Sequence, residues 1–401
     1  MAKTQKSPAS LVSRPVWADV LLPRLIHNFN AIRAYVNPAQ ENRSVPRKVL
    51  CIVKGNGYGH GGPEVAMALE EAGADWFGVT CTEEGIAARQ AGVRKPILIL
   101  TSFVPGEESR LIENDLTAVI HRCEQLPLLE LAAASQKKHV SFHLKMDTGM
   151  NRLGISPHAV DCFARQLAKC PHLELGGVFT HFASSEVMAD TPVGRQTREQ
   201  EDLFFAALDG LRALGIHPGI VHLANSAAIV TRPDTWADMV RPGAILYGYH
   251  PGYEPIEKRA EFEARLPLQP VMSLRSRIIS LRDVPAGSGV GYNSTFIPHR
   301  PSRIAVLAAG YGDGIHRSLG NRGSVLLRGK LAPMVGIVSM DVTMIDVTDV
   351  QGVEIGDVAT IYGVDGELTH PAHLVARSIG TVTSDLLCAV SQRVPRVYSH
   401  T

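Results

Sequence analysis

The 401-residue chain is long enough for more than one domain, and 45% of its residues are hydrophobic, enough for one large core and a smaller second one. Its 40 basic and 39 acidic residues give a formal net charge of +1, whereas surfaces that bind nucleic acid or anionic membranes need clustered positive charge. The composition therefore argues against those two partner classes and favours a small-molecule function.

Targeting and redox signals are weak in this chain. The first segment, Met1 to Ser13, is polar and lacks the apolar centre of a signal peptide, and no later run approaches the length of a membrane span. We therefore expect a cytoplasmic protein. No C-x-x-C pair indicates a metal or redox centre, so no metal is expected. We interpret the cysteines as buried thiols: Cys51, Cys81, Cys123, Cys162, Cys170 and Cys388.

The first predicted strand, Trp17–Leu22, closes an N-terminal segment of residues 1–22 and is a candidate to pair with a later β-rich domain. Eight further short runs rich in β-branched and apolar residues follow. They are Val49–Lys54, Trp76–Thr80, Ile97–Thr101, Thr117–His121, Val140–Met146, Leu175–His181, Gly219–Leu223 and Met239–Leu246. Helical periodicity separates several of them, as in Gly62–Ala72, Glu84–Ala91, His158–Lys169 and Thr197–Leu214. Alternating strands and crossovers of this kind predict an α/β domain, a TIM-like (β/α)8 barrel over residues 23–262.

The pattern changes near Leu266, where strands broken by glycine and proline follow one another without helical crossovers. These strands are Pro270–Leu281, Arg303–Ala309, Ser324–Leu327, Lys330–Val338, Met344–Asp346 and Asp357–Ile361. We predict a mainly β C-terminal domain over residues 263–401, with the joint in Glu261–Leu268.

Polar side chains follow the barrel strands at their C-terminal ends, where the active sites of such barrels lie. They include Lys54, Lys145, His181, Asn225 with Ser226, and Arg241. The run Met146–Gly154 is the densest example, because it places Lys145, Asp147 and Arg152 behind a buried strand. Since ionised groups are costly beside a core, these strand ends predict a functional site.

Lys54 opens a glycine-rich turn that also carries Tyr58 and His60. An isolated lysine there would be a solvated strand end, but the surrounding glycines suit an amine that forms an imine with an aldehyde cofactor, for which pyridoxal phosphate is the natural candidate. Its phosphate needs a cradle in the last two strand loops, where Ser226, Gly243 and Ala244 are available. Asn225 or Ser226 also fits a helix N-cap, and the two roles are compatible.

Nine sequence blocks occur in the order found in one enzyme family. They are V-K-G-N-G-Y-G-H-G, K-M-D-T-G-M-N-R-L-G, T-H-F-A, A-N-S-A, R-P-G-A-I-L-Y-G, G-V-G-Y-N-S-T-F, G-Y-G-D-G, V-S-M-D and R-V-P-R. On these blocks the chain resembles the alanine racemases, fold-type III pyridoxal-phosphate enzymes, from about Trp17 to Tyr398. The resemblance implies a small amino-acid substrate and D-alanine supply for peptidoglycan.

The resemblance also implies a role for each matching residue. Lys54 would carry the cofactor and share proton transfer with Tyr292, which would act on the other face of the substrate from the partner subunit of a head-to-tail homodimer. Met340 and Asp341 would likewise lie in the partner's active site, and Tyr311 would line the substrate entrance. Tyr58, Ser226 and Gly243 would hold the phosphate. Taken alone, Tyr292 also fits a packed core or edge-strand aromatic residue.

Arg241 would donate a hydrogen bond to the pyridine nitrogen and, since a guanidinium keeps its protons, would leave that nitrogen unprotonated. His181 would donate toward Arg241, although a satisfied barrel histidine is the alternative. Arg152 would approach the phenolic oxygen of the cofactor and the substrate carboxylate. Lys145 matches a lysine that is carbamylated in many relatives.

Ser384 departs from the family pattern, in which a tyrosine usually narrows the substrate pocket. A broader or serine-preferring racemase is therefore one alternative, unless a neighbouring side chain fills the space. A pyridoxal-phosphate decarboxylase and a non-catalytic pyridoxal-phosphate carrier are the other candidates. Arg241 argues against the decarboxylase, and the β-rich domain with Tyr292 argues against the carrier.

Overall fold

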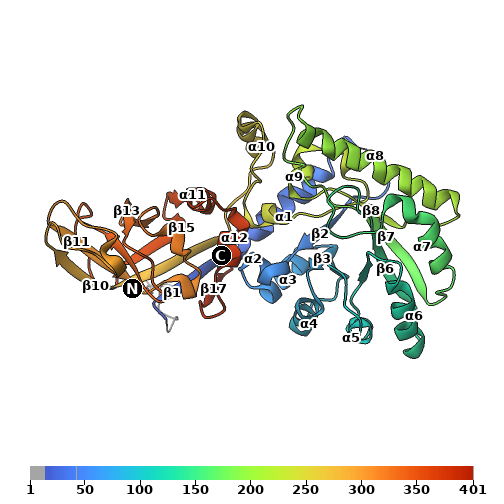
Figure 1. Ribbon diagram of the computed structural model, residues 1–401, viewed down its shortest axis with the longest axis horizontal. Coiled ribbons are helices and arrows are strands. Elements are labelled where there is room, and N and C mark those ends of the chain that lie inside the picture. Colours follow the sequence, from blue (N-terminus) through green and yellow to red (C-terminus); the bar gives the residue numbers. More distant parts are fainter. Residues whose placement is uncertain (1–13, 42, 401) are drawn as a thin grey trace, which may run out of the picture. The chain divides into compact units, whose positions relative to one another are not determined.

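The computed structural model describes residues 14–41 and 43–400, so the predicted polar segment Met1–Ser13 lies outside the described residues. The chain divides into two compact units (Figure 1). The barrel unit comprises residues 25–57 and 62–269, and the C-terminal unit comprises the described residues before 25, residues 58–61 and residues 270–400. No helix in the described ranges is long and apolar enough to cross a membrane.

The barrel unit contains eight parallel strands. They are β2 (Lys48–Ile52), β3 (Trp76–Val79), β4 (Ile97–Ile99), β5 (Ala118–Ile120), β6 (Val140–Lys145), β7 (Leu173–Phe179), β8 (Ile220–His222) and β9 (Met239–Val240). They pair in the orders β4-β3-β2-β9 and β5-β6-β7-β8. A parallel bridge between Leu98 and Thr117 joins β4 to β5, and the amide of Asp238 donates to the carbonyl of Val221 at 3.0 Å beside β8 and β9. The predicted TIM-like barrel is confirmed.

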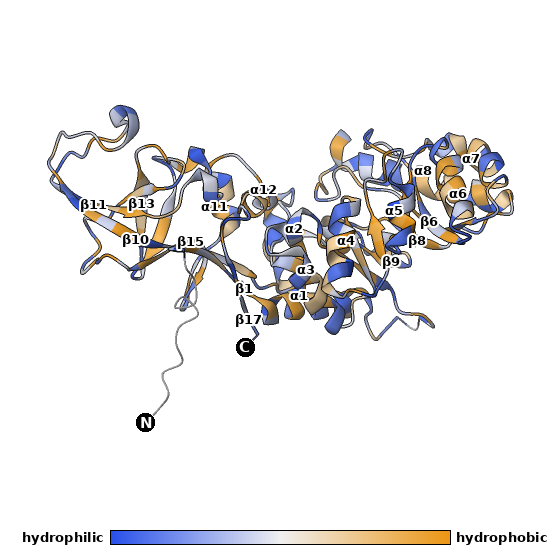
Figure 2. Ribbon diagram, turned by 90° about the horizontal axis from the view of Figure 1, so that it is seen from below, coloured by the Kyte–Doolittle hydropathy of each residue, from blue (hydrophilic) through white to orange (hydrophobic). Residues whose placement is uncertain are grey.

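Helices cover the outside of these strands (Figure 1). They are α1 (Leu22–Val36), α3 (Gly62–Glu71), α4 (Thr82–Ala91), α5 (Glu108–Glu113), α6 (Gln125–Ser135), α7 (Val160–Leu167), α8 (Pro192–Ala213) and α9 (Ser226–Thr231). In α8, Thr191 caps the amide of Gly194 and proline opens the first turn, while Phe204 and Leu208 are buried. Figure 2 shows the corresponding pattern of apolar strands and partly polar helices.

Three local predictions need correction. The last barrel strand ends at Val240 rather than Leu246, because Pro242 lacks an N–H and residues Ala244–Tyr247 form the 3-10 helix η4. Lys54 does not end a strand but begins the short helical turn α2 (Lys54–Tyr58). The cysteines are not all buried, since Cys162 and Cys388 are exposed.

The C-terminal unit is built on nine strands in the order β16-β15-β12-β13-β14-β11-β10-β1-β17. Their bounds are β1 (Val16–Leu21), β10 (Met272–Val284), β11 (Ser302–Leu307), β12 (Ser324–Leu327), β13 (Lys330–Val335), β14 (Thr343–Asp346), β15 (Val358–Asp365), β16 (Leu368–His370) and β17 (Arg396–Ser399). All neighbours run antiparallel except β1 and β17, which are parallel. The mainly β C-terminal domain is confirmed.

The edges of this unit contain elements that the sequence pattern did not predict. These are β16, β17 and the helices α11 (Ala372–Ser378) and α12 (Thr383–Cys388). Strand β1 pairs with β10 in the register Val16 with Ser276. The predicted joint Glu261–Leu268 overlaps helix α10 (Arg259–Arg265), and the two compact units divide after Gln269.

Candidate active site

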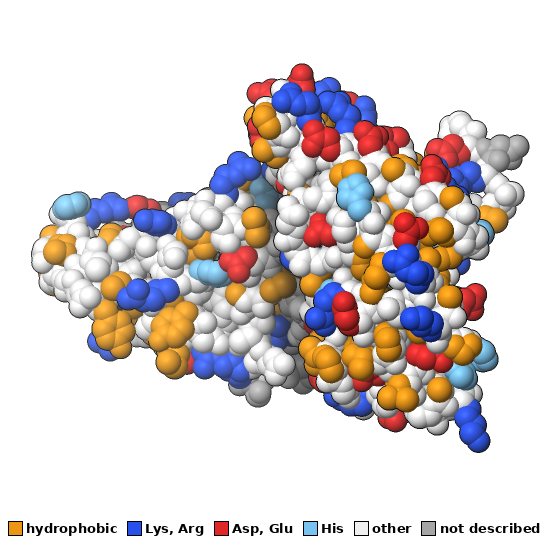
Figure 3. All heavy atoms as spheres, turned by 45° about the vertical axis from the view of Figure 1, so that its right-hand side comes forward, with side chains coloured by type: hydrophobic (Ala, Val, Ile, Leu, Met, Phe, Trp, Pro, Cys, Tyr) orange, Lys and Arg blue, Asp and Glu red, His pale blue; other side chains and the backbone are white. Residues whose placement is uncertain are grey.

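Four cations gather where the barrel strands end. Burial, followed by the positive charges of Arg241, Arg152 and Lys54, lowers the pKa of Lys145 to about 8, against a weaker opposite effect of Asp147. The Lys145 ammonium lies 5.2 Å from the centre of the Phe179 ring, and the Arg241 guanidinium 5.4 Å from the same ring. Like charges held together in this way favour an anionic ligand. Elsewhere on the visible surface, basic and acidic side chains are interspersed (Figure 3).

Lys54 stands at the start of a left-handed turn. Gly55, Asn56 and Gly57 have φ values of 62°, 53° and 62°, a conformation that glycine adopts freely and asparagine tolerates better than most residues. The Asn56 side chain accepts a hydrogen bond from the amide of Gly62 at 2.8 Å. This turn directs the chain out of the barrel two residues after the end of β2.

The carboxylate of Glu84, in the first turn of α4, holds this left-handed turn. Its Oε1 accepts the amides of Gly55 (2.7 Å) and Asn56 (3.4 Å), and its Oε2 accepts the amide of Thr80 (2.8 Å). Glu84 is absent from the residues predicted for the site. Its only sequence signal is an acidic residue in the first turn of the helix after the second strand, which also suits a helix terminus.

We expect Glu84→Ala to lower the free energy of unfolding by about 2 kcal/mol, because three amides lose their acceptor. The free energy of unfolding of Glu84→Gln should lie between those of Glu84→Ala and the natural protein, since the glutamine side chain keeps one acceptor oxygen. Thermal unfolding measures both variants. Glu83→Ala is the matched control, because its carboxylate is exposed and forms an ion pair with exposed Arg110. Equal melting temperatures for Glu84→Ala and Glu83→Ala would contradict this role.

Asp147 organises the loop that carries Arg152. Its two carboxylate oxygens accept the amides of Gly149 (3.1 Å), Asn151 (2.9 Å) and Arg152 (3.0 Å). Gly154 closes the loop at a φ of 139°, and a Cβ there would lie 2.3 Å from the amide nitrogen of Asp147. The carboxylate therefore holds the turn. The Arg152 guanidinium has no hydrogen bond or ion pair within the described ranges.

Arg241 is only 4% exposed and is fixed by neutral acceptors. Its Nη1 donates to the carbonyl (2.8 Å) and Nδ1 (3.1 Å) of His222, and its Nη2 donates to the carbonyls of Thr180 (2.8 Å) and Leu223 (2.7 Å). A weaker contact of 3.3 Å joins Nη2 to Nδ1 of His181. Among the described residues none accepts a hydrogen bond from its Nε–H, so this donor is available to a ligand.

The contact between His181 and Arg241 runs opposite to the predicted direction. A guanidinium only donates, so His181 accepts through Nδ1 rather than donating toward Arg241. Burial, followed by the charges of Arg241 and Lys145, holds the pKa of His181 well below its usual value. Burial also lowers the pKa of Arg241 to about 9, still above neutral pH. The pair is therefore a neutral imidazole beside a protonated guanidinium.

The loops after β8 and β9 meet at Ser226. Asn225 caps α9, because its Oδ1 accepts hydrogen bonds from the amides of Ala227 (3.1 Å) and Ala228 (3.0 Å). Of the two predicted N-cap candidates, Asn225 and not Ser226 takes this role. The Ser226 hydroxyl accepts the amide of Gly243 at 2.8 Å, which leaves the hydroxyl proton for another acceptor. Ala244 begins η4, where the first amides have no partners inside the helix.

Several further residues predicted for the site lie in the C-terminal unit. Tyr292 begins the 3-10 turn η6 (Tyr292–Ser294) and is 69% exposed, so it is not a packed core aromatic within this chain. Tyr311, in η7 (Tyr311–Asp313), and Met340 are also exposed.

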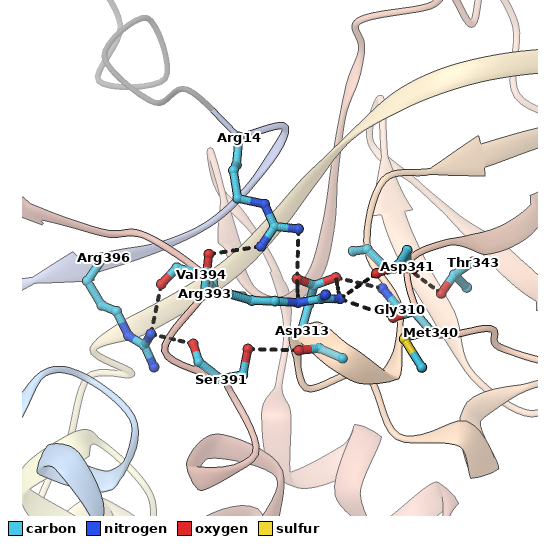
Figure 4. A network of polar contacts seen from close by, with 12 residues as sticks. Arg14, Gly310, Asp313, Met340, Asp341, Thr343, Ser391, Arg393, Val394 and Arg396 are labelled. Atoms are coloured by element: carbon cyan, nitrogen blue, oxygen red, sulfur yellow. Dashed lines mark hydrogen bonds and ion pairs between the residues drawn. The ribbon is translucent and has the colours of Figure 1, made fainter.

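Buried Asp313 shares η7 with Tyr311. Arg393 links Asp313 to the Met340–Asp341 segment (Figure 4). Arg393 donates to both oxygens of Asp313 (2.9 and 3.1 Å) and to Asp341 (2.9 Å), and the amide of Tyr311 donates to the carbonyl of Ser339 (2.9 Å). Asp313 and Arg393 belong to the motifs G-Y-G-D-G and R-V-P-R, but neither is among the residues predicted for the site. Their ion pair joins a 3-10 helix and a turn that are 80 residues apart in the sequence.

Tyr58 and Ser384 also belong to the C-terminal unit. Burial raises the pKa of Tyr58 to about 12, and Cys388 on α12 adds to the effect. Ser384 lies half-buried on the same helix. The carbonyl of Gly59 accepts a hydrogen bond from Nε of Arg396 at 3.0 Å. Helix α12 and the segment after Tyr58 are thus parts of one environment.

A closed parallel barrel that gathers cations at its strand ends, followed by an antiparallel β domain, defines a class of two-domain barrel enzymes. The family models described as "Alanine racemase, N-terminal domain" and "Alanine racemase, C-terminal domain" match residues 20–251 and 271–398. The chain belongs to the alanine racemase family, and the protein is an isomerase.

Individual relatives match over nearly their full lengths. The alanine racemase of Methanococcus maripaludis is 38% identical over 392 residues, which cover 97% of this chain and 100% of that protein. The alanine racemase of Halothermothrix orenii is 37% identical over 389 residues, covering 97% and 98%. The solved alanine racemase of Clostridium difficile 630 and that of Bacillus anthracis with bound L-Ala-P each have a TM-score of 0.87 and 32% identity, covering 97% of this chain and 96% of theirs.

Proposed function

We propose that this protein interconverts L-alanine and D-alanine with pyridoxal phosphate as its cofactor. The observation that carries the proposal is Arg241, a buried cation whose four terminal N–H groups have acceptors while its Nε–H remains available. When bound, pyridoxal phosphate withdraws electrons from Cα of an attached amino acid and so acidifies the Cα–H bond. The surrounding cations suit its negative charge.

The residues of the barrel unit fit the chemical groups of this cofactor. Lys54 would supply the amine that binds its aldehyde carbon, and Arg241 would donate Nε–H to the ring nitrogen. The free hydroxyl proton of Ser226 and the amide of Ala244 would bind phosphate. By the family resemblance, Tyr58, which belongs to the C-terminal unit, would be a further donor. Arg152, with no partner in the described ranges, would bind the phenolic oxygen and the substrate carboxylate. Asn225 would support the phosphate site as its helix cap, and His181 would support Arg241.

Racemisation requires proton removal from one face of Cα and delivery to the other, which one base cannot readily do. We assign one face to the Lys54 amine and the other to the Tyr292 phenol of the partner subunit in a homodimer. The high exposure of Tyr292 supports a position at an interface. Tyr311, Met340 and Asp341 would line the substrate entrance, held by Arg393 and buried Asp313.

Two rival activities fit less well. A decarboxylase benefits from a protonated ring nitrogen and an acidic partner, whereas the hydrogen-bond partners of Arg241 are carbonyls and neutral histidines. A carrier of pyridoxal phosphate has no use for a second base on an additional domain. The family relation and the charge pattern support a cytoplasmic enzyme that supplies D-alanine for peptidoglycan.

A chiral assay of alanine tests the proposal. Purified protein loaded with pyridoxal phosphate should convert either pure enantiomer to a near-equal mixture, because the two enantiomers have equal free energies. Reduction of the cofactor linkage with borohydride should stop the reaction. If neither alanine nor any other small amino acid is racemised by cofactor-loaded protein, the proposal fails.

Lys145 is a candidate for carbamylation. Its amine is surrounded by three cations and has no ion pair within the described ranges; addition of CO2, with loss of a proton, would give an anion that orients Arg152. Because the pKa of Lys145 is about 8, the fraction of its amine in the reactive neutral form increases as the pH rises through that value. We expect a carbamate signal in ¹³C NMR with labelled bicarbonate, growing with pH and absent in Lys145→Arg. A natural protein without that signal would contradict this modification.

Ser384 is the candidate for substrate selection. If its small side chain enlarges the pocket, Ser384→Tyr should reduce kcat/KM for L-serine relative to L-alanine by about tenfold or more, within the usual range for one small group. Thr383→Ser on the same helix is the control and should leave the ratio unchanged. If instead a neighbouring side chain fills the space, the natural protein will prefer alanine and Ser384→Tyr will not alter the ratio.

A further inference from the structure

Two histidines continue the Arg241 network into the barrel core. His222 on β8 accepts a hydrogen bond from Arg241 at Nδ1, and its Nε2 lies 2.9 Å from Nδ1 of His143 on β6. Both imidazoles are fully buried. Burial, followed by the charge of Arg241, lowers the pKa of His143 to about 3 and that of His222 well below its usual value. Both rings are therefore neutral at pH 7.

A neutral imidazole carries one N–H, so the direction of each hydrogen bond from Arg241 to His222 to His143 follows from the first donor, Arg241. The guanidinium can only donate, which makes Nδ1 of His222 an acceptor and places the proton on Nε2. Nε2–H of His222 then donates to Nδ1 of His143. The proton of His143 consequently lies on its own Nε2, and each bond of the chain points away from Arg241.

The barrel packs tightly around the imidazole of His143. A Cβ on Gly177, which pairs with His143 across β6 and β7, would lie 2.6 to 2.8 Å from three atoms of the imidazole. Trp76 lies beside the same ring, with centroids 5.2 Å apart. Nε2 of His143 is buried and has no hydrogen-bond partner in the described part of the chain, a cost that an apolar residue would avoid.

We propose that His143 is a positioning residue, which accepts a hydrogen bond from Nε2–H of His222 and thereby holds Nδ1 of His222 as an acceptor for Arg241. Because Nδ1 of His143 serves as this acceptor, the proton of His143 lies on Nε2, where the described residues offer no hydrogen-bond partner. Arg241 is thus oriented by neutral groups and keeps its full positive charge. The inference rests on the proposed function only for its catalytic effect, because the tautomers exist without substrate.

Nitrogen NMR tests the tautomers directly. In protein labelled with ¹⁵N-histidine at pH 7, the signals lost in His222→Asn and His143→Asn should each belong to a neutral ring protonated at Nε2. An Nδ1–H tautomer, or an imidazolium, at either residue would overturn the proposal. This measurement does not depend on racemase activity. It can therefore show that the tautomer assignment is wrong even if the protein is a racemase, and the reverse.

Variants test the effect on catalysis. His143→Phe keeps a ring but removes the acceptor, and we expect kcat for alanine to fall about tenfold with the cofactor still bound. His143→Asn places an acceptor oxygen near the position of Nδ1 and should recover most of the activity. Exposed His139→Phe is the control. Equal kcat for His143→Phe and the natural protein overturns the proposal; if His143→Phe does not fold, the tautomers decide it.

Discussion

Lys54→Ala should abolish alanine racemisation, with a loss of at least about 10⁴-fold in kcat. Two contributions add: a positioned base accounts for about 10²–10⁴-fold, and the covalent attachment of the cofactor is lost as well. The variant should bind pyridoxal phosphate only weakly and release it on gel filtration. Activity and the absorbance of the retained cofactor measure the two effects separately.

A matched lysine variant controls for a general loss of charge. Lys169 is exposed at the end of α7 in the same barrel unit, so Lys169→Ala should keep both activity and bound cofactor. The fold should survive in Lys54→Ala, because the Glu84 carboxylate still accepts the backbone amides of Gly55 and Asn56 in the left-handed turn. Racemisation within tenfold of the natural rate would show that Lys54 is not the essential amine.

Tyr292→Phe should reduce racemisation by about 10²–10⁴-fold while leaving the cofactor bound. The aromatic ring remains and only the phenolic proton donor and acceptor is removed. Since Lys54 still serves one face of Cα, one enantiomer should continue to exchange its α-hydrogen with deuterated water, and the other should not. ¹H NMR of each pure enantiomer in deuterated water measures this asymmetry.

The control for this variant is Tyr35→Phe, at a half-buried tyrosine that packs against Trp236 in the barrel unit. It removes one hydroxyl away from the strand ends and should not change the rate. Loss of exchange in both enantiomers of Tyr292→Phe would mean that the phenol is needed for both faces. Retention of full racemisation would assign the second base to another residue.

Much of the fold could be predicted because its signals are local. The barrel strands carry apolar runs between amphipathic segments, and glycine and proline mark the change to antiparallel strands. Asp147 was also predictable as a turn residue, since its partners lie two to five residues away. Helix α12 and strand β17 were missed, because a six-residue helix and a four-residue strand carry little periodicity.

The supporting interactions of the site could not be predicted in the same way. Glu84 reaches back 29 residues to Gly55, and His143 and His222 are 79 residues apart. Each has an ordinary local explanation, as an acidic residue near a helix start or a histidine in an apolar strand. Their roles depend on which strands are neighbours in the barrel.

Mixing two inactive variants tests the shared active site most directly. If Lys54 of one subunit works with Tyr292 of the partner subunit, a heterodimer of Lys54→Ala and Tyr292→Phe chains contains one site with both bases intact. Co-refolded or co-expressed variants should therefore recover about a quarter of the natural activity when dimers form at random. No recovery, although natural chains treated identically regain full activity, would contradict catalysis by residues from two subunits.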